Sequence, residues 1–347
     1  MKAVQYSAAG RENGRVTDIP YPVCGDNQVI IKVMSAGICK DSERMIDTEG
    51  SPLDNYPLVP GHEFSGYIHE VGKNVTTFKI GDRVTADNTV LCGECYFCQK
   101  DDPLHCEHFG SLGHNIDGGM AEYVAVNKDK VFHIPDNLSF NAASLTEPVA
   151  CVMHGLDRLN VQYGEVVLVF GAGPHGQIAS MLLQHSNASA VICIAPTQKK
   201  LDMLTKKGIE TICMDRNDYS IHENAIRARF PHGVDAVFNT TGSGQLIQSA
   251  VRMLRPGGRI IQYAPCVKED ELKAVNAREF YFKELSWIVS SCQTHCYGRS
   301  LDAMASGVVD ADMLVSHEFE LDDYFRALDM NMTSKDVIKI ILHPNKD

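Results

Sequence analysis

The first part of the chain, up to about residue 150, is built from short runs in which apolar positions cluster or alternate with polar ones. Residues 28–37 (QVIIKVMSAG), 64–72 (FSGYIHEVG) and 121–134 (AEYVAVNKDKVFHI) are examples, and turn-forming stretches such as CGDN and VGKN separate the runs. A period of two residues places successive side chains on opposite faces of a strand. The pattern therefore predicts a β-rich domain over residues 1–150, folded as a barrel-like or bent sheet.

The pattern changes near residue 140. Residues 141–159 (NAASLTEPVACVMHGLDRL) have the spacing of a helix, and short apolar runs then alternate with helix-like segments. Strands that are apolar throughout are typical of a parallel sheet covered by helices on both faces. The strand-like runs are VVLVF, AVICIA, TICM, DAVFNT and GRIIQYA, and the pattern fades near LSWIVSSC. We expect a nucleotide-type domain over residues 151–292 and a C-terminal segment, 293–347, that returns to the first domain.

Composition and charge narrow the class of protein. Hydrophobic residues make up 44% of the 347 positions and charged residues 22%, as in ordinary globular proteins. The net charge of −12 disfavours a general affinity for nucleic acid or anionic membranes. No apolar run approaches the roughly 18 residues that a membrane span needs, and the opening residues lack the apolar core of a signal peptide. We therefore expect a cytoplasmic protein whose partners are small molecules.

Four of the twelve cysteines form a compact motif, C-x2-C-x2-C-x7-C, within LCGECYFCQKDDPLHC. Four thiolates at this spacing can hold one tetrahedral Zn²⁺ in a closed, structural site. An iron–sulfur site of the bacterial ferredoxin type would need a gap of three residues before the last cysteine and a proline after it. The acidic surroundings, QKDDPLHCEH, also disfavour a nucleic-acid-binding zinc ribbon. The motif consists of Cys92, Cys95, Cys98 and Cys106.

A second, chemically mixed set of metal-ligand residues lies outside this motif. Cys39 occurs in AGICKDSE, His62 and Glu63 in PGHEFSG, and Glu147 in TEPVAC. One thiolate, one imidazole and a carboxylate can bind Zn²⁺ and leave a position open for substrate. Taken singly, Cys39 could be a buried core residue and Glu147 a carboxylate at a helix N-terminus. As a set they indicate a catalytic metal.

A glycine-rich turn follows the apolar run EVVLVF and precedes a helix-like segment. It reads Gly171-Ala-Gly173-Pro174-His175-Gly176. In this pattern the first glycine allows a tight turn, the second lets the backbone approach a pyrophosphate, and the third lets the helix pack closely on the strand. The strand before it and the helix after it make dinucleotide binding the stronger interpretation, ahead of an unliganded turn.

The next strand ends at a position that distinguishes the two nicotinamide dinucleotides. NAD-binding folds place an acidic residue about 20 positions further on, where it binds the ribose 2′-hydroxyl. Here Ala195 occupies that position, and Lys199 and Lys200 follow. Without the carboxylate a 2′-phosphate is not repelled, and a nearby cation attracts it. We expect NADP(H) to be accepted or preferred over NAD(H), although the lysines could also be a solvated start of a helix.

Together these motifs resemble the zinc-containing medium-chain dehydrogenases. The resemblance covers nearly the whole chain and adds GICKD, GDRV at 81–84, GGMAEYVAV at 118–126, DAVFNTTG and RPGGRI. It implies an α/β protein, with a GroES-like β-rich catalytic domain at 1–150, a structural zinc lobe at about 90–107 and a Rossmann domain with a doubly wound parallel sheet at 151–292. Glu147, where many alcohol dehydrogenases have cysteine, makes the chain similar to the polyol branch, such as sorbitol and galactitol-phosphate dehydrogenases.

The resemblance also implies residue roles and a reaction. Cys39, His62, and Glu63 or Glu147 would hold a catalytic zinc that binds the substrate alkoxide, and a hydride would pass to the nicotinamide of NAD(P)⁺. The four cysteines of the lobe would hold a structural zinc, and the enzyme would be a homodimer or homotetramer. A dehydrogenase of another secondary alcohol, such as L-threonine, and a non-catalytic protein of the same fold are the alternatives.

The chain departs from the family at one place. Members usually have Ser or Thr two residues after the zinc cysteine and Asp three after it, whereas this chain has Asp41 and then Ser42. The hydroxyl in that pattern passes the alcohol proton to solvent. Either Asp41 accepts the proton directly, or Ser42 or a water molecule does so by a shifted route.

Overall fold

The computed structural model describes residues 1–48, 50, 55–265 and 269–346. The chain divides into two compact units. The first unit contains Met1–Pro148 and Tyr297–Asp347, and the second contains Val149–Cys296. Among the described residues no helix combines the length and the apolar character that crossing a membrane requires.

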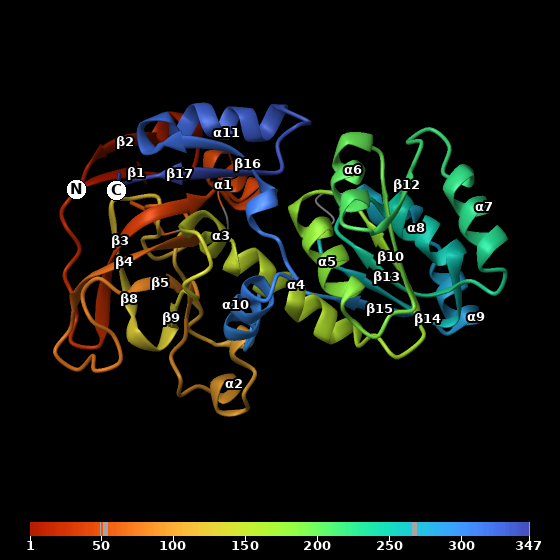
Figure 1. The fold of residues 1–347 in the computed structure, drawn as a ribbon, viewed down its shortest axis with the longest axis horizontal. Coiled ribbons are helices and arrows are strands. Elements are labelled where there is room, and N and C mark those ends of the chain that lie inside the picture. The colour runs from red at the N-terminus through yellow and green to blue at the C-terminus, as the bar shows by residue number, and fades with distance from the viewer. Residues whose placement is uncertain (49, 51–54, 266–268, 347) are drawn as a thin grey trace. The chain divides into compact units, whose positions relative to one another are not determined.

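The first unit is organised by a seven-stranded sheet whose main order is β16-β17-β3-β4-β5-β9, with β8 paired to β3. The long central strand β3 pairs antiparallel with β4, β8 and β17 (Figure 1). Its alternating, mostly buried residues pack into one hydrophobic core. The strands are β3 (Gln28–Gly37), β4 (Glu63–Val71), β5 (Arg83–Ala86), β8 (Tyr123–Asn127), β9 (Val131–His133), β16 (Val315–Glu320) and β17 (Lys339–His343).

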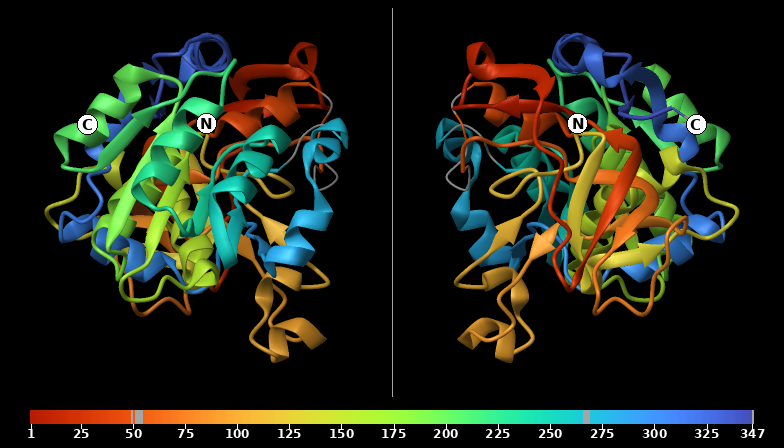
Figure 2. Two further views of the ribbon diagram at one scale, coloured as in Figure 1. Left: turned by 90° about the vertical axis from the view of Figure 1, so that its right-hand side faces the viewer. Right: turned by 90° about the vertical axis from the view of Figure 1, so that its left-hand side faces the viewer.

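Two short antiparallel pairs and several helices complete the first unit. The lobe that carries α2 extends from the rest of this unit (Figure 2). The two pairs are β1 (Lys2–Tyr6) with β2 (Gly14–Asp18), and β6 (Thr89–Val90) with β7 (Gly110–Ser111). The helices are α1 (Lys40–Asp47), α2 (Tyr96–Gln99), α3 (Phe140–Ser144), α10 (Tyr297–Ala305) and α11 (Tyr324–Thr333). Helix α4 (Thr146–Leu159) contains the boundary between the units.

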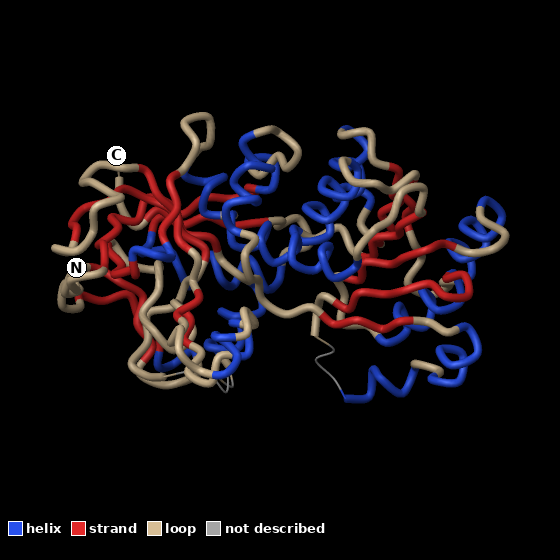
Figure 3. Tube along the Cα trace, turned by 90° about the horizontal axis from the view of Figure 1, so that it is seen from below, coloured by secondary structure: helices blue, strands red, loops and turns tan. Residues whose placement is uncertain are grey.

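The second unit contains a six-stranded, fully parallel sheet in the order β12-β11-β10-β13-β14-β15. Its inner strands are buried on both faces, because helices lie on both sides of the sheet (Figure 3). This is the doubly wound order of dinucleotide-binding folds, in which ligands bind beside the strand where the order reverses. That strand is β10. The predicted α/β fold class is confirmed.

The apolar runs of the sequence form five of these six strands, and the sixth, β15, was not predicted. Strand β15 is an edge strand, and its side chains are largely exposed. An edge strand has no need for a continuous apolar run, which explains why the pattern fades there. The strands are β10 (Val166–Phe170), β11 (Ala190–Ala195), β12 (Glu210–Cys213), β13 (Val234–Asn239), β14 (Leu254–Gln262) and β15 (Ser286–Val289). The helices are α5 (Pro174–Gln184), α6 (Gln198–Lys206), α7 (Ser220–Arg229), α8 (Gly244–Met253) and α9 (Ala277–Lys283).

Candidate functional site

The pairing of β3 with β4 brings three of the expected metal ligands together. Cys39 caps the N-terminus of α1 just after β3, and Glu63 is the first residue of β4, directly after His62. Gly37 on β3 lies opposite Glu63 on β4. The ligand atoms of Cys39, His62 and Glu63 consequently lie within 4.8 Å of one another.

The donor atoms of this group fit a bound metal ion. Within the described part of the chain, Nδ1 of His62 and Oε2 of Glu63 are buried and have no hydrogen-bond partner. Buried polar atoms without partners are costly. A cation that accepts thiolate, imidazole and carboxylate ligands would satisfy them, and Zn²⁺ is the divalent ion that matches this mixed set.

Glu147 lies outside the group of atoms that converge, although it is close enough to influence it. The residue is in the first turn of α4. Desolvation, followed by the charge of Glu63, raises the pKa of the Cys39 thiol to about 11, and the charge of Glu147 adds to the rise. The predicted role of Glu147 as a ligand remains a proposal.

Two buried charged residues near the group were not predicted from the sequence. Lys339 on β17 lies with Nζ 2.5 Å from Oε1 of Glu63, and both side chains are almost fully buried. Burial lowers the pKa of Lys339, but the charges of Glu63 and Cys39 more than offset this, so its pKa is raised. The sequence signal is a lysine inside an apolar strand-like run, VIKIIL.

Glu43 on α1 is the second of these residues. It is fully buried, and neither carboxylate oxygen has a hydrogen-bond partner among the residues that the structure describes. Burial raises its pKa well above the ordinary value, and the charge of Cys39 raises it further. In the sequence, the signal for the burial of Glu43 was its inward position on an amphipathic helix.

Ser42, one of the candidates for the proton relay, lies close to a histidine that stacks on His62. Ser42 Oγ lies 3.2 Å from Nε2 of His114, whose ring stacks on His62 with 4.6 Å between the ring centroids. Nδ1 of His114 is 2.9 Å from Ser111 Oγ. Burial, followed by the charge of His62, lowers the pKa of His114 to about 3. Asp41, by contrast, has an exposed side chain.

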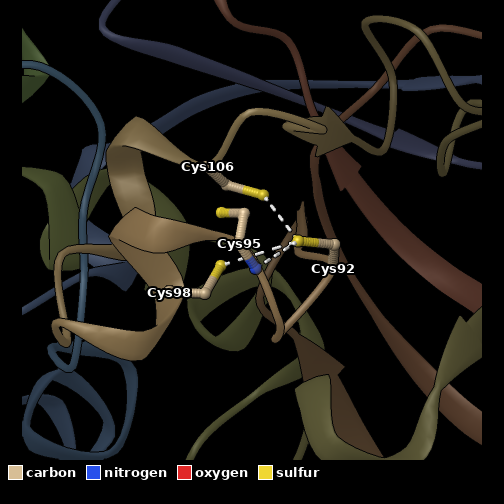
Figure 4. Close-up of side chains that lie close together, drawn as sticks. All are labelled: Cys92, Cys95, Cys98 and Cys106. Atoms are coloured by element: carbon tan, nitrogen blue, oxygen red, sulfur yellow. Dashed lines mark hydrogen bonds between the residues drawn. The ribbon is translucent and has the colours of Figure 1, made fainter.

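The four cysteines of the lobe converge on a single point (Figure 4). Their Sγ atoms lie within 4.8 Å of one another, and Sγ of Cys92 is 4.0 Å from Cys98 and 3.6 Å from Cys106. Backbone N–H groups of Cys98 and Glu107 lower the pKa of Cys95 to about 6 and so favour its thiolate, the form that binds metal. A closed set of four thiolates fits a structural Zn²⁺.

The glycine-rich turn has the geometry that a dinucleotide needs. Gly171 directly follows β10 and has a φ of +99°, and α5 begins at Pro174 with Gly173 as its N-cap. A Cβ on Gly176 would lie 1.9 Å from the carbonyl oxygen of Gly171, whereas a Cβ on Gly173 would meet nothing within 4 Å. Gly176 thus allows close packing of helix on strand, and Gly173 leaves space for a pyrophosphate at the helix N-terminus.

The residues expected to distinguish NAD from NADP lie at the end of the neighbouring strand. Ala195 is buried and ends β11, and Lys199 and Lys200 are in the first turn of α6. Lys199 is exposed and Lys200 is half-buried. The ring of His175, within the glycine-rich turn, packs against Tyr263 with 5.0 Å between the centroids.

Comparisons with known proteins agree with this geometry. Residues 25–136 match the alcohol dehydrogenase GroES-like domain and residues 174–306 match the zinc-binding dehydrogenase domain. The chain is 33% identical to D-arabinitol dehydrogenase 1 of Uromyces fabae, over 93% of this chain and 92% of that protein. It is 30% identical to sorbitol dehydrogenase of Bacillus subtilis, over 96% and 94% of the two chains. A zinc-binding dehydrogenase of Sinorhizobium meliloti, solved with bound NADP, superimposes with a TM-score of 0.87 at 26% identity over 99% of each chain.

Proposed function

Because this chain belongs to the zinc-dependent alcohol dehydrogenase family, we propose that it oxidises a secondary alcohol of a polyol or polyol phosphate to the ketose. The family makes it a zinc-binding, NAD(P)-dependent oxidoreductase. The observation that carries the polyol assignment is a site with one thiolate, one imidazole and a carboxylate, in a chain whose relatives are named for D-arabinitol and sorbitol.

Residues of the first unit would have separate roles in the reaction. Cys39, His62 and Glu63 would hold the catalytic zinc, with Glu147 as an additional or exchanging ligand. When bound, zinc lowers the pKa of the substrate hydroxyl and polarises the ketone in the reverse direction. Cys92, Cys95, Cys98 and Cys106 would hold a structural zinc that fixes the lobe between β6 and β7. The first unit is thus the catalytic domain and the second the nucleotide-binding domain.

We place the proton relay at Ser42. Its hydroxyl can accept a proton and donate one, and it lies within hydrogen-bond distance of His114, which stacks on His62. The side chain of Asp41, by contrast, is exposed to solvent. The relay hydroxyl then lies one position later in the sequence than in the family pattern. The proton would leave by a different route, and the metal ligands stay the same.

We propose that NADP(H) is preferred over NAD(H). Gly171, Gly173 and Gly176 would hold the pyrophosphate, with Pro174 and His175 between them at the start of α5. The lack of a carboxylate at Ala195 and the cations of α6 favour a 2′-phosphate. Substituting Ala195→Asp should move the ratio of kcat/KM values toward NAD⁺, and a wild-type enzyme that favours NAD⁺ tenfold would contradict the preference.

We also propose a homodimer formed by two copies of β15, as the simplest of the expected oligomers. Strand β15 is at the edge of the parallel sheet, and an open edge can pair with a second copy across a two-fold axis. Trp287 and Val289 on the strand and Tyr281 and Phe282 on α9 are exposed apolar residues. A dimer or tetramer by light scattering would fit this proposal, and a strict monomer would refute it.

For the location we propose the cytoplasm, since the described cysteines are all free thiols.

The decisive test is NAD(P)H absorbance during oxidation of a panel of polyols, free and phosphorylated, with L-threonine and simple secondary alcohols included. We expect activity on one or two polyols or polyol phosphates, with the ketose as product. Activity confined to L-threonine or to simple secondary alcohols would overturn the polyol assignment and retain the family chemistry.

A further inference from the structure

Lys339 is a buried cation whose place in the sheet is determined by strand register. Ile341 of β17 pairs with Gly37 of β3, and Leu342 pairs with Ala36. Just beyond these pairs, the N–H of Ile38 donates to the carbonyl oxygen of Ile340, the residue after Lys339, at 3.0 Å. The lysine is 3% exposed, and a buried ammonium group is costly unless it is paired. Its partner is Oε1 of Glu63, at 2.5 Å.

Gly37 allows the side chains of Lys339 and Glu63 to meet. Glu63 is on β4 and Lys339 on β17, and β3 lies between these strands. Neighbouring strands are about 4.8 Å apart, so the two backbones are separated by roughly 10 Å. Gly37 pairs with Ile341 on one side and Glu63 on the other. A Cβ on Gly37 would lie 2.4 Å from Oε2 of Glu63, so the lysine reaches the glutamate over a strand that has no side chain at this point.

The pairing leaves the two oxygens of Glu63 in different situations. Oε1 is held by Lys339. Oε2 is buried and has no hydrogen-bond partner in the described part of the chain. Glu63 contributes a carboxylate oxygen to the group in which the atoms of Cys39 and His62 lie within 4.8 Å.

We propose that Lys339 is the positioning residue of the catalytic metal centre, and that it holds Oε1 of Glu63 so that Oε2 is presented to the metal beside Cys39 and His62. The proposal rests on the zinc site of the proposed function. Lys339 would act through Glu63 and would itself contact neither metal nor substrate. It would restrict Glu63 to one-oxygen ligation and so leave part of the metal's coordination open for the alcohol.

Lys339 could affect metal affinity through its charge or by orienting Glu63, and the two roles predict opposite effects when the lysine is removed. If the lysine acted only through its charge, its loss would tighten the hold on a dication. If it acts by orienting Glu63, its loss leaves the carboxylate free to turn away, and removal of such an outer partner typically costs about 10–100-fold in metal affinity. We expect orientation to prevail, because the charge of Lys339 is already balanced by Oε1 of Glu63 at 2.5 Å.

The test compares three variants of the full-length, zinc-loaded protein. Lys339→Met removes the ammonium group, and Lys339→Arg keeps the charge and changes the geometry. Lys130→Met is the matched control, because Lys130 is also largely buried and ion-paired, 3.2 Å from Asp87 in the same unit. Zinc per chain and the rate of zinc release to a chelator are measured for each, with the four-cysteine site as the internal reference. The visible spectrum after Co²⁺ replacement reports the ligands of the catalytic site.

We expect Lys339→Met to release one of two zinc ions at least about tenfold faster than wild type, with a changed Co²⁺ spectrum. Lys339→Arg should show a smaller effect in the same direction, and Lys130→Met should match wild type. Unchanged or slower release from a folded Lys339→Met protein would overturn the proposal. If Lys339→Met does not fold, a wild-type Co²⁺ spectrum and release rate in Lys339→Arg would overturn it. These measurements need no substrate, so a failure of the polyol assignment would leave them interpretable.

Discussion

Replacing Gly176 by alanine should damage both the stability of the second unit and its affinity for nucleotide. The added Cβ would lie 1.9 Å from the carbonyl oxygen of Gly171 and 2.8 Å from its carbonyl carbon. Both atoms belong to the backbone, so no side-chain rotation can relieve the overlap. Helix α5 must therefore move away from the end of β10.

The size of the effect follows from the steric overlap. Ordinary C···O contacts are more than 3 Å, so α5 has to move by about 1 Å, and forced overpacking of this kind typically costs about 1–3 kcal/mol. A domain of about 150 residues loses roughly 2–4 °C of Tm per kcal/mol. We thus expect the Tm of Gly176→Ala to fall by about 2–12 °C. The shift of the helix N-terminus should also weaken NADP⁺ binding at least about tenfold.

Gly173→Ala separates binding from stability. A Cβ at Gly173 meets nothing within 4 Å, and the backbone there has a φ of −71° that any residue adopts. This variant should keep a Tm close to that of wild type and still lose nucleotide affinity, because its methyl group occupies the space of the pyrophosphate. Thermal unfolding and a titration of nucleotide fluorescence measure the two effects. A Gly176→Ala protein with the Tm and the affinity of wild type would refute the reasoning.

Three further predictions address the rest of the molecule. Cys98→Ser should reduce the zinc content from two ions to one per chain and lower the Tm, and metal analysis that still finds two ions would exclude the four-thiolate site. Ser42→Ala should lower kcat by about 10²-fold and alter its pH profile, while Asp41→Asn should change neither, so the opposite result in steady-state kinetics would move the relay to Asp41. Arg259 lowers the pKa of Glu165 from its ordinary 4.5, so the pair stabilises the fold fully above pH 4.5 and the contribution is lost as the pH falls through the lowered value. In denaturant titrations Glu165→Gln should therefore be less stable than wild type at pH 7, and this difference should shrink in acid.

The sequence predicted the inner strands of the second unit well because they are buried on both faces. Runs such as VVLVF and AVICIA must be apolar throughout, and they correspond to β10 and β11. Strand β15 escaped prediction because one of its edges is open and its residues are largely exposed. Local pattern carries no information about which strand will lie at an edge.

The candidate site was predictable where ligand chemistry shows in the residue type. Cysteine and histidine in short motifs identified Cys39 and His62, because few other roles require these residues at such places. Lys339 was not predictable, because it is nearly 280 residues from Glu63 along the chain and only the pairing of β17 with β3 brings them together. A lone lysine in an apolar strand indicates a buried partner but does not identify it.

The way the chain is divided between the two units has a consequence for the order of folding during synthesis. Residues 149–296 form the second unit from one continuous stretch, whereas the first unit also needs residues 297–347, which supply β16 and β17. The nucleotide-binding unit can therefore fold on the ribosome while the catalytic unit still lacks two strands and Lys339. Until β17 emerges, β3 lacks its second neighbour at Ala36 and Gly37, and Glu63 lacks its cation. A shortage of zinc or a delay at this stage should leave a half-built catalytic unit as the species that chaperones and proteases encounter.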